Sequence, residues 1–388
     1  SSSARLFAHL TLVWIHKSFQ RPTACPWKES NFQLPMTAWS AASAVEGTGV
    51  QRRWVHETPW PSYALACSAT KNPTLRLAVG SCVEQESNRV QVIEVNEESK
   101  TFDLVAEAEH PFPPTKLMWN PPNLENDALG QLDLLASVST ALNLWKMEDG
   151  QLQLIKEFAN TTQNAQNGAL PPLTSFDWNA LNHHRIGTAS VDTTCTIWNL
   201  EKQRIETQLI AHDKAVLDIA FSQEFLFASV GADGSVRLFD LRNLEHSTII
   251  YESTAPSPLL RLAWNGINKN HIATIAMNAP GVIIVDIRRP SVALAALSSN
   301  DSYVNHVAWA PHSRSHLLGG TSDGMALFWD VNDTQGLQDD ATATGTSSRT
   351  APVLAHGCSR EVYQALWPTS QPDCMALGFA RQVEVTQI

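Results

Sequence analysis

The sequence predicts an all-β protein, a seven-bladed β-propeller closed by an N-terminal strand. Three observations support this fold. A short window that ends in an aromatic residue recurs along the chain, an Asp-Gly turn separates two apolar strand-like runs, and several repeat units end in Trp or Asp. A period of about 40 to 45 residues is the length of one four-stranded propeller blade.

The recurring window places an aromatic residue directly before a turn residue. The windows are Lys116-Leu-Met-Trp119, Ser175-Phe-Asp-Trp178, Asp218-Ile-Ala-Phe221, Arg261-Leu-Ala-Trp264, His306-Val-Ala-Trp309 and Gln364-Ala-Leu-Trp367. A degenerate copy, Ala64-Leu-Ala-Cys67, brings the predicted blades to seven. The aromatic residues lie 59, 43, 43, 45 and 58 residues apart, so some units carry insertions. The largest insertion, residues 332–352, is rich in Thr, Ser, Asp and Gly, and we expect it to be a mobile loop.

One unit shows the strand pattern of a blade clearly. The run from Val216 to Ser222 alternates, the run from Phe225 to Val230 is apolar, and the run from Val236 to Leu241 alternates again. Between the last two lies Ala232-Asp233-Gly234-Ser235. An Asp-Gly pair between apolar runs predicts a hairpin, because glycine adopts the positive φ that such turns need.

The two ends of the repeat region predict how the ring closes. Residues 381–388 resemble the third strand of the last blade, and its fourth strand must come from elsewhere. Residues 51–57 precede the first blade and have strand character, so we expect them to complete the last blade and remove its exposed edge. The propeller is therefore predicted over residues 51–388. Residues 1–50, with no acidic residue before Glu29, are expected to be a disordered or non-core extension.

Composition restricts the class of function. The 27 basic and 38 acidic residues give a formal charge of −11, which disfavours direct binding to nucleic acid. No apolar stretch approaches the ~20 residues that span a bilayer, so no membrane association is expected. The six cysteines include no Cys-x-x-Cys pair, which indicates a reducing compartment, here the cytoplasm and nucleus. No cofactor, metal or small-molecule substrate is predicted.

The predicted blades contain parts of a structural network that joins a His, a Ser or Thr, a turn Asp and a Trp. The candidate members are His212, Ser229 and Asp233 in one unit, Thr188, Asp192 and Trp198 in another, and Asp323 and Trp329 in a third. No unit carries all four, since Phe239 replaces Trp in the first. We interpret these residues as buried hydrogen-bonding groups. Apolar packing between blades is then expected to supply most of the stability.

Longer segments resemble a known family. These are Asp192-Thr-Thr-Cys-Thr-Ile-Trp198, Glu206-Thr-Gln-Leu-Ile-Ala-His-Asp-Lys214, Phe227-Ala-Ser-Val-Gly-Ala-Asp-Gly-Ser-Val-Arg237 and Pro258-Leu-Leu-Arg-Leu-Ala-Trp-Asn265. They resemble the Transparent Testa Glabra and light-regulated WD proteins of plants, which are WD40-repeat proteins. The animal counterpart is a WD scaffold for DYRK-type kinases that is also classed as a cullin-4-associated factor. The resemblance implies a non-catalytic hub for bHLH and MYB transcription factors or for kinases.

A pair of Asp-x-Arg sequences follows two predicted third strands. They are Asp240-Leu-Arg242 and Asp286-Ile-Arg288, and they are similar to the box by which WD proteins are recruited to the cullin-4 adaptor. An Arg side chain offers a planar fork to acidic or carbonyl partners. The simpler alternative is a local Asp–Arg pair, because residues i and i+2 share a face of a strand.

Two further features concern partners and catalysis. Val191, Ala232 and Ser322 flank the turn Asp residues, and they are candidates for a partner-binding face. Gly320-Thr321-Ser322-Asp323-Gly324 matches the hydrolase pattern G-x-S-x-G but lies in a predicted hairpin, so we interpret the match as chance. A propeller enzyme would need acid, base or metal groups clustered at the central opening, and the sequence indicates none.

The leading hypothesis is therefore a scaffold that assembles regulatory protein complexes. The alternatives are a substrate receptor of a cullin-4 ubiquitin ligase and a structural subunit of a larger assembly.

Overall fold

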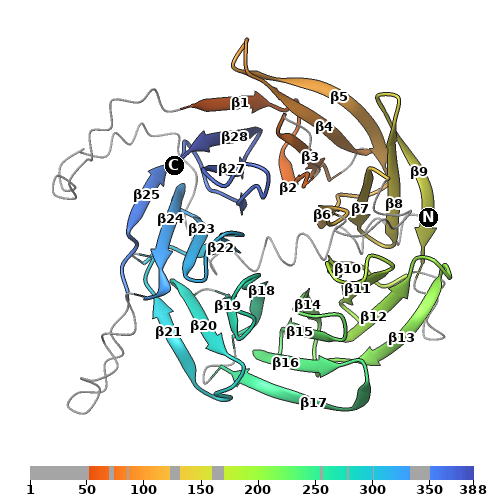
Figure 1. Cartoon of the computed structure of the whole chain (residues 1–388), viewed down its shortest axis with the longest axis vertical. Helices are drawn as coiled ribbons and strands as arrows, with labels where there is room; N and C mark the ends of the chain where they lie inside the picture. The colour runs from red at the N-terminus through yellow and green to blue at the C-terminus, as the bar shows by residue number, and fades with distance from the viewer. Residues whose placement is uncertain are drawn as a thin grey trace.

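The computed structural model describes residues 52–69, 74–84, 87–122, 132–159, 170–253, 257–277, 279–299, 301–332 and 350–388. These residues form seven four-stranded antiparallel sheets arranged in a ring, with the first strand of each blade nearest the axis (Figure 1). The seven-bladed propeller predicted from the sequence is confirmed. The predicted N-terminal extension and most of the predicted mobile loop lie outside the described residues.

The first three blades follow one another along the chain. Blade 1 consists of β2 (Ser62–Cys67), β3 (Arg76–Ser81), β4 (Asn88–Asn96) and β5 (Thr101–His110). Blade 2 consists of β6 (Lys116–Trp119), β7 (Leu134–Val138), β8 (Leu142–Glu148) and β9 (Gln151–Phe158). Blade 3 consists of β10 (Leu173–Trp178), β11 (Arg185–Ser190), β12 (Thr194–Asn199) and β13 (Arg204–Ile210).

The next three blades repeat this order. Blade 4 consists of β14 (Val216–Phe221), β15 (Leu226–Gly231), β16 (Ser235–Asp240) and β17 (Asn243–Glu252). Blade 5 consists of β18 (Leu259–Trp264), β19 (His271–Ala276), β20 (Val282–Asp286) and β21 (Ala293–Leu297). Blade 6 consists of β22 (Val304–Trp309), β23 (His316–Thr321), β24 (Met325–Asp330) and β25 (Leu354–Gly357).

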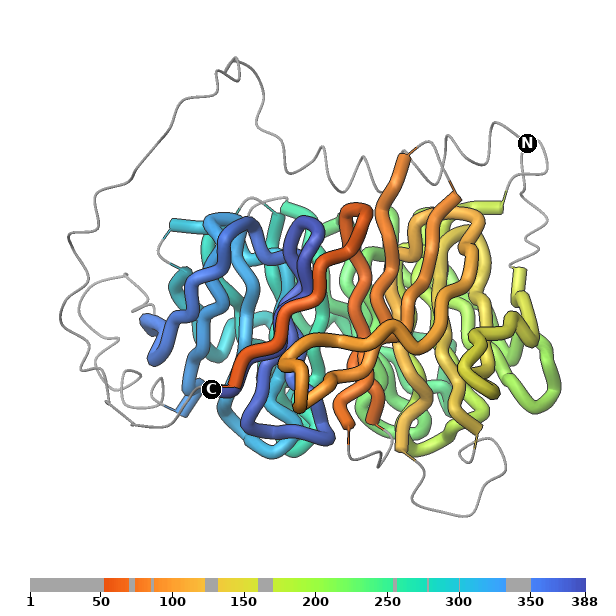
Figure 2. The backbone as a smooth tube through the Cα atoms, turned by 90° about the horizontal axis from the view of Figure 1, so that it is seen from above, coloured from red at the N-terminus to blue at the C-terminus, as the bar shows by residue number. Residues whose placement is uncertain are grey.

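Blade 7 combines the two ends of the propeller. It consists of β26 (Gln364–Leu366), β27 (Cys374–Phe379), β28 (Gln382–Gln387) and, as its outer strand, β1 (Arg53–Glu57). Strand β1 pairs antiparallel with β28, from Arg53 opposite Thr386 to Glu57 opposite Gln382. The red β1 accordingly lies beside the blue C-terminal strands in Figure 2. Closure by an N-terminal strand is confirmed, and it pairs the edge of β28 that would otherwise be open.

The ring has two faces, because successive antiparallel strands place their turns at alternating ends (Figure 2). The Asp-turn face carries the turns between second and third strands, such as the turn at Asp233, and the links between blades. The Arg-turn face carries the turns between first and second strands and between third and fourth strands, such as the turn at Arg242. At the Asp-turn face Gly234 has φ +83°, as the predicted hairpin requires.

Apolar side chains fill the spaces between blades. Each of the seven apolar clusters among the described residues combines side chains from at least two neighbouring blades. The window aromatics Trp119, Trp178 and Trp309 belong to these clusters and are buried. A single sheet has two apolar faces, so each blade buries both only between two neighbours.

Buried asparagines after two window aromatics connect neighbouring blades at the Arg-turn face. In Asn179, Oδ1 accepts the N–H groups of Leu181 and Asn182 at 2.9 Å, and Nδ2 donates to Glu224 O of blade 4 at 3.0 Å. Asn265 repeats the arrangement: its Oδ1 accepts two turn N–H groups, and its Nδ2 donates to Arg314 O of blade 6 at 3.0 Å. One side chain thus fixes a turn and joins it to the next blade.

The closing blade contains a fully buried carboxylate. Glu384 of β28 accepts hydrogen bonds from Arg53 of β1 at 2.9 Å and from His356 of β25 at 3.1 Å, and its side chain is 0% exposed. Burial acts to raise the pKa of Glu384, but the hydrogen bonds from His356 and Arg53 hold the pKa below its ordinary value. Glu384 therefore joins the closing strand, blade 7 and blade 6.

The first prediction concerns the asparagine contacts. Asn265→Ala should lower the free energy of unfolding by about 2 to 3 kcal/mol, because a buried side chain that makes three hydrogen bonds, each worth about 1 kcal/mol, is lost. The exposed Asn243→Ala should change it by less than about 0.5 kcal/mol. Chemical denaturation of both variants would measure the difference, and equal effects would contradict the interpretation.

The second prediction concerns ring closure and pH. Glu384→Gln should destabilise the protein by about 1 to 2 kcal/mol at neutral pH, because two charge-assisted hydrogen bonds are weakened. A carboxyl whose pKa is lowered by folding stabilises above its unfolded pKa of about 4.3, and that contribution is lost as the pH falls through the folded value. The two proteins should therefore converge in stability below about pH 4. Thermal melts from pH 7 to pH 3 test this, and a constant difference would contradict it.

Candidate functional site

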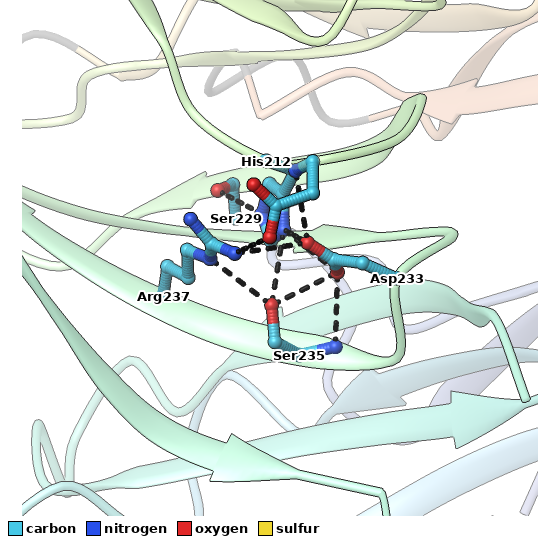
Figure 3. Close-up of polar contacts among 6 residues, drawn as sticks. His212, Ser229, Asp233, Ser235 and Arg237 are labelled. Atoms are coloured by element: carbon cyan, nitrogen blue, oxygen red, sulfur yellow. Dashed lines mark hydrogen bonds and ion pairs between the residues drawn. The ribbon is translucent and has the colours of Figure 1, made fainter. Parts of the chain in front are cut away.

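The blade 4 network brings three predicted residues together (Figure 3). Nε2 of His212 lies 2.7 Å from Oγ of Ser229, and Nδ1 lies 3.0 Å from both carboxylate oxygens of Asp233. Asp233 also accepts hydrogen bonds from Ser235 and Arg237. Burial acts to raise the pKa of Asp233, but its hydrogen bonds with His212 and Ser235 hold the pKa well below its ordinary value. Phe239, in place of Trp, stacks on Phe227 at 4.9 Å.

This network has the connectivity of a Ser-His-Asp catalytic triad, but it is sealed. Ser229 is 0% exposed and His212 is 1% exposed, so a substrate cannot reach the hydroxyl. The network instead fixes the turn of blade 4 against the link that enters the blade. The G-x-S-x-G match also lies in a hairpin, between β23 and β24, where Ser322 Oγ accepts the N–H of Tyr303 at 3.2 Å.

The networks predicted in blades 3 and 6 are only partly assembled. Trp198 Nε1 donates to Thr188 Oγ1 at 3.0 Å, but Asp192 accepts from Thr194 within its own turn. In blade 6 Asp323 accepts from the Thr321 hydroxyl, whereas Trp329 Nε1 donates to Ser298 O at 2.9 Å. The structure therefore separates Asp192 from Trp198 and Asp323 from Trp329.

Blade 2 holds a network that the sequence analysis missed. Ser137 Oγ lies 3.0 Å from Nε2 of His110 and accepts from Trp145 Nε1 at 2.8 Å. Burial lowers the pKa of His110 to about 4, so the ring is neutral at pH 7. The hairpin between β7 and β8 is shorter than the one in blade 4 and has no turn Asp. A motif that requires the turn Asp therefore does not identify the His–Ser–Trp combination.

The two Asp-x-Arg sequences form matching forks on the Arg-turn face. Arg242 donates to Asp240 through Nε at 2.9 Å and through a terminal nitrogen at 2.5 Å. Arg288 donates to Asp286 in the same way, at 3.0 and 2.6 Å. The local pairing considered as the simpler alternative is therefore present. The Arg side chains nonetheless stay 70% and 63% exposed, so each fork holds a guanidinium in place and leaves N–H groups for a partner.

The three residues predicted for a partner face lie on the Asp-turn face, opposite the forks. Ala232 is only 8% exposed and belongs to a core cluster, so its side chain offers little surface for contact. Val191 and Ser322 are half-buried. Each of the three backbone N–H groups donates to the residue just before its blade's first strand, for example Ala232 to Ala215 O at 2.8 Å. The accessible part of this prediction is therefore Val191 and Ser322.

Polar side chains from several blades meet along the central axis, contrary to the expectation that no charged groups cluster there. Lys116 Nζ of blade 2 lies 3.5 Å from Asp218 Oδ1 of blade 4, and Ser175 Oγ of blade 3 donates to the same oxygen at 2.5 Å. Arg261 of blade 5 donates to the Tyr63 hydroxyl of blade 1 at 3.1 Å. The Lys116–Asp218 and Tyr63–Arg261 contacts join blades that are not neighbours, so we name these two the cross-channel contacts.

The signal for this cluster lay in the first position of the recurring window. The residue at that position is polar in five of the windows: Lys116, Ser175, Asp218, Arg261 and His306. A β-bulge directly precedes it in blades 1, 3, 4, 5 and 6. A bulge re-aims the side chains beside it, and here it marks the position whose side chains meet along the axis.

The channel groups differ in charge state. Burial, with the nearby Arg261 and Lys116, lowers the pKa of His306 to about 3, so it is neutral at pH 7. Burial raises the pKa of Asp177 to about 6, and its Oδ2 accepts the N–H of Phe221 at 2.7 Å. Burial also acts to raise the pKa of Asp218, but Lys116 and Arg261 hold the pKa below its ordinary value. Lys116 and Asp218 are thus paired within the protein, whereas Asp177 accepts a backbone N–H and forms no ion pair with a described residue.

The potential metal ligands and the thiols of the described residues can be considered together. No group of three or more His, Cys, Asp or Glu that could hold a metal ion occurs among them. Burial raises the pKa of Cys67 above its ordinary value, that of Cys82 to about 11 and those of Cys195 and Cys358 to about 12, which disfavours the reactive thiolate. No helix long and apolar enough to cross a membrane occurs in the part of the chain that the structure describes.

The raised pKa of Asp177 generates a third prediction. Asp177→Asn should stabilise the protein by up to roughly 2 kcal/mol at pH 7.5, because it removes a buried charge and keeps an acceptor for Phe221. A carboxyl whose pKa is raised by folding is neutral in the folded state below about pH 6, so the gain should shrink as the pH falls through 6. Chemical denaturation of both proteins at pH 7.5 and pH 5 measures the gain in stability, and an equal gain at both pH values would contradict the prediction.

Comparison with known proteins places these features in a family. Residues 203–240, which include the blade 4 network, match the family model described as "WD domain, G-beta repeat". The chain is 36% identical over 335 residues to an uncharacterised WD repeat-containing protein of Schizosaccharomyces pombe, covering 79% of this chain and 75% of the relative. It is 44% identical over 339 residues to a protein of Dictyostelium discoideum named "DDB1- and CUL4-associated factor 7 homolog", covering 87% of this chain and 99% of the relative. With this similarity over almost the whole relative, and with its seven WD40-type blades, the chain belongs to the family of the DDB1- and CUL4-associated factor 7 homolog.

Proposed function

We propose that this protein is a non-catalytic WD40 scaffold that assembles regulatory protein complexes in the cytoplasm and nucleus. The observation that carries the proposal is the matched pair of forks, Asp240–Arg242 and Asp286–Arg288, on neighbouring blades of the Arg-turn face. The opposite face stays available to a second protein. A ring with two separate binding faces holds two proteins together without chemistry of its own.

The forks have the properties of a preorganised binding element. Each carboxylate holds its guanidinium by two hydrogen bonds, so little side-chain freedom is lost when a partner binds. Arg presents its donors in a planar fork that suits carboxylate and carbonyl groups. The blades beneath are packed on both sides, which keeps the distance between the two forks constant.

The buried polar groups fit a scaffold better than an enzyme. The Ser229–His212–Asp233 chain is sealed from solvent, and the charged channel groups bind one another. A catalytic acid or base needs access to its substrate. We therefore assign these groups to holding the ring together.

We propose that the forks bind the adaptor subunit of cullin-4 ligases, because the Dictyostelium relative carries DDB1 and CUL4 in its name. The resemblance to the plant WD proteins and their animal counterpart suggests bHLH or MYB transcription factors, or DYRK-type kinases, as the regulators. We place them on the Asp-turn face near Val191 and Ser322. Joint binding would raise their effective concentration, often to about the mM range.

The forks also favour a second function, that of a substrate receptor of a cullin-4 ubiquitin ligase. In that case the protein bound on the Asp-turn face would be ubiquitinated and degraded. The two functions share the adaptor contact and differ in the fate of the second protein.

The fourth prediction tests the forks. Affinity purification of the tagged full chain should recover the cullin-4 adaptor together with transcription factors or a kinase. Arg242→Ala with Arg288→Ala should reduce adaptor recovery by about tenfold or more, because both anchoring guanidinium groups are lost. Recovery of the regulators should not change, since they bind the other face.

A matched control is Lys202→Ala with Arg204→Ala, which removes two exposed cations from blade 3. It should leave adaptor recovery unchanged. Equal adaptor recovery by wild type and the fork variant would refute the adaptor contact. Accumulation of a bound regulator when the fork variant replaces the wild type in cells would favour the substrate-receptor function over the simple scaffold.

A further inference from the structure

Exposed cations gather on one sector of the Arg-turn face. The turns of blades 4, 5 and 6 carry Arg242, Lys269, Arg288, Arg289 and Arg314, all exposed. Among their described turn residues the one acid is Glu224, and Asp240, Asp286 and Asp330 end the strands that precede three of these turns. The corresponding described turns of blades 1 to 3 carry mainly acids, namely Glu97, Glu98, Asp133, Asp149 and Glu201, with Lys100 and Lys202. The chain as a whole has a formal charge of −11, so this sector runs against the overall charge.

Three of these cations do not belong to the Asp–Arg forks. Lys269, Arg289 and Arg314 form no ion pair with a described residue, whereas Arg242 and Arg288 are paired with aspartates. Asp286 lies beneath the surface, at 3% exposure, so the groups that meet an approaching partner at this point are the cations. We name Lys269, Arg289 and Arg314 the basic sector.

The backbone of each sector residue is held in place. Trp264 Nε1 donates to Lys269 O at 2.8 Å, Arg289 N donates to Asp286 O at 2.9 Å, and Asn265 Nδ2 donates to Arg314 O at 3.0 Å. Ile287 N also bonds Asn270 O at 2.9 Å, which ties the two turns of blade 5 together. The cations therefore project from a fixed frame, which lowers the entropy cost of binding.

Apolar side chains lie among the cations. Ile267 is 41% exposed and lies two residues before Lys269, and Val292 is 56% exposed and lies three residues after Arg289. A polyanion such as nucleic acid gains little from exposed aliphatic groups and is repelled by the acidic remainder of the chain. A protein segment that combines carboxylates with apolar side chains satisfies both kinds of group.

We infer that the basic sector of blades 5 and 6 binds an acidic protein segment that also carries apolar residues. The inference goes beyond the adaptor contact proposed above: it uses three cations outside the forks, and it rests on that proposal only in sharing the same face. The acidic segment aligns its carboxylates with Lys269, Arg289 and Arg314 and covers Ile267 and Val292. This extends the binding surface from the forks toward blade 6.

The fifth prediction uses a fluorescein-labelled peptide rich in Asp, Glu and Leu, and fluorescence anisotropy with the full chain. The variant Lys269→Glu/Arg289→Glu/Arg314→Glu should weaken binding by about tenfold or more, since three attractions become repulsions. The matched control Lys100→Glu/Lys202→Glu/Arg204→Glu makes the same charge change on blades 1 and 3 and should bind within about twofold of wild type. Thermal melts establish that both variants are folded.

The outcomes separate this inference from the proposed function. No binding of the peptide by wild type, or equal loss in both variants, overturns the inference. Stronger binding of a single-stranded DNA oligonucleotide or of phosphatidylserine vesicles than of the peptide also overturns it. Adaptor capture that depends on Arg242 and Arg288 would still support the proposed adaptor contact in any of those cases.

Discussion

Burial of both faces of every sheet is the constraint on which the structure depends. A lone blade leaves two apolar faces exposed, and only a closed ring covers all fourteen faces of seven blades. This is why a strand from the N-terminal side completes blade 7, and why Glu384 is buried where β1, blade 7 and blade 6 meet. The polar networks are additions to this frame: they vary from blade to blade, while the apolar interface occurs between every pair.

The fold could be predicted from the sequence because its signals are local. The window aromatics and the Asp-Gly hairpin depend on residues close together in the chain, and the unpaired last strand indicated closure. The Asp240–Arg242 fork was predictable for the same reason, since i and i+2 share a face. Ala232 was predicted to lie on an accessible face, but it packs into a core cluster that also contains Leu217 and Leu260 of blades 4 and 5.

The central cluster could not be predicted because its signal is spread around the ring. Each blade contributes a different residue type at the first window position, so no motif repeats, and the chemistry appears only when Lys116 and Asp218 meet from different blades. The blade 2 network escaped for a related reason: His110, Ser137 and Trp145 keep their contacts although the hairpin has lost the turn Asp. A repeat pattern identifies the residues that the blades have in common, whereas these two sites are built from residues that differ between blades.

The cross-channel contacts have a consequence for how this chain can change over time. When repeat units contact only their neighbours, substitutions at one interface between two units do not affect the other interfaces. Here Lys116 and Asp218 are 102 positions apart in sequence, and Tyr63 and Arg261 are 198 apart. A substitution at one end of such a contact removes the hydrogen-bond or charge partner of a residue on a distant blade. We therefore expect substitutions at these positions to be tolerated best in matched pairs, which links the variation of blade 2 to that of blade 4 and of blade 1 to that of blade 5.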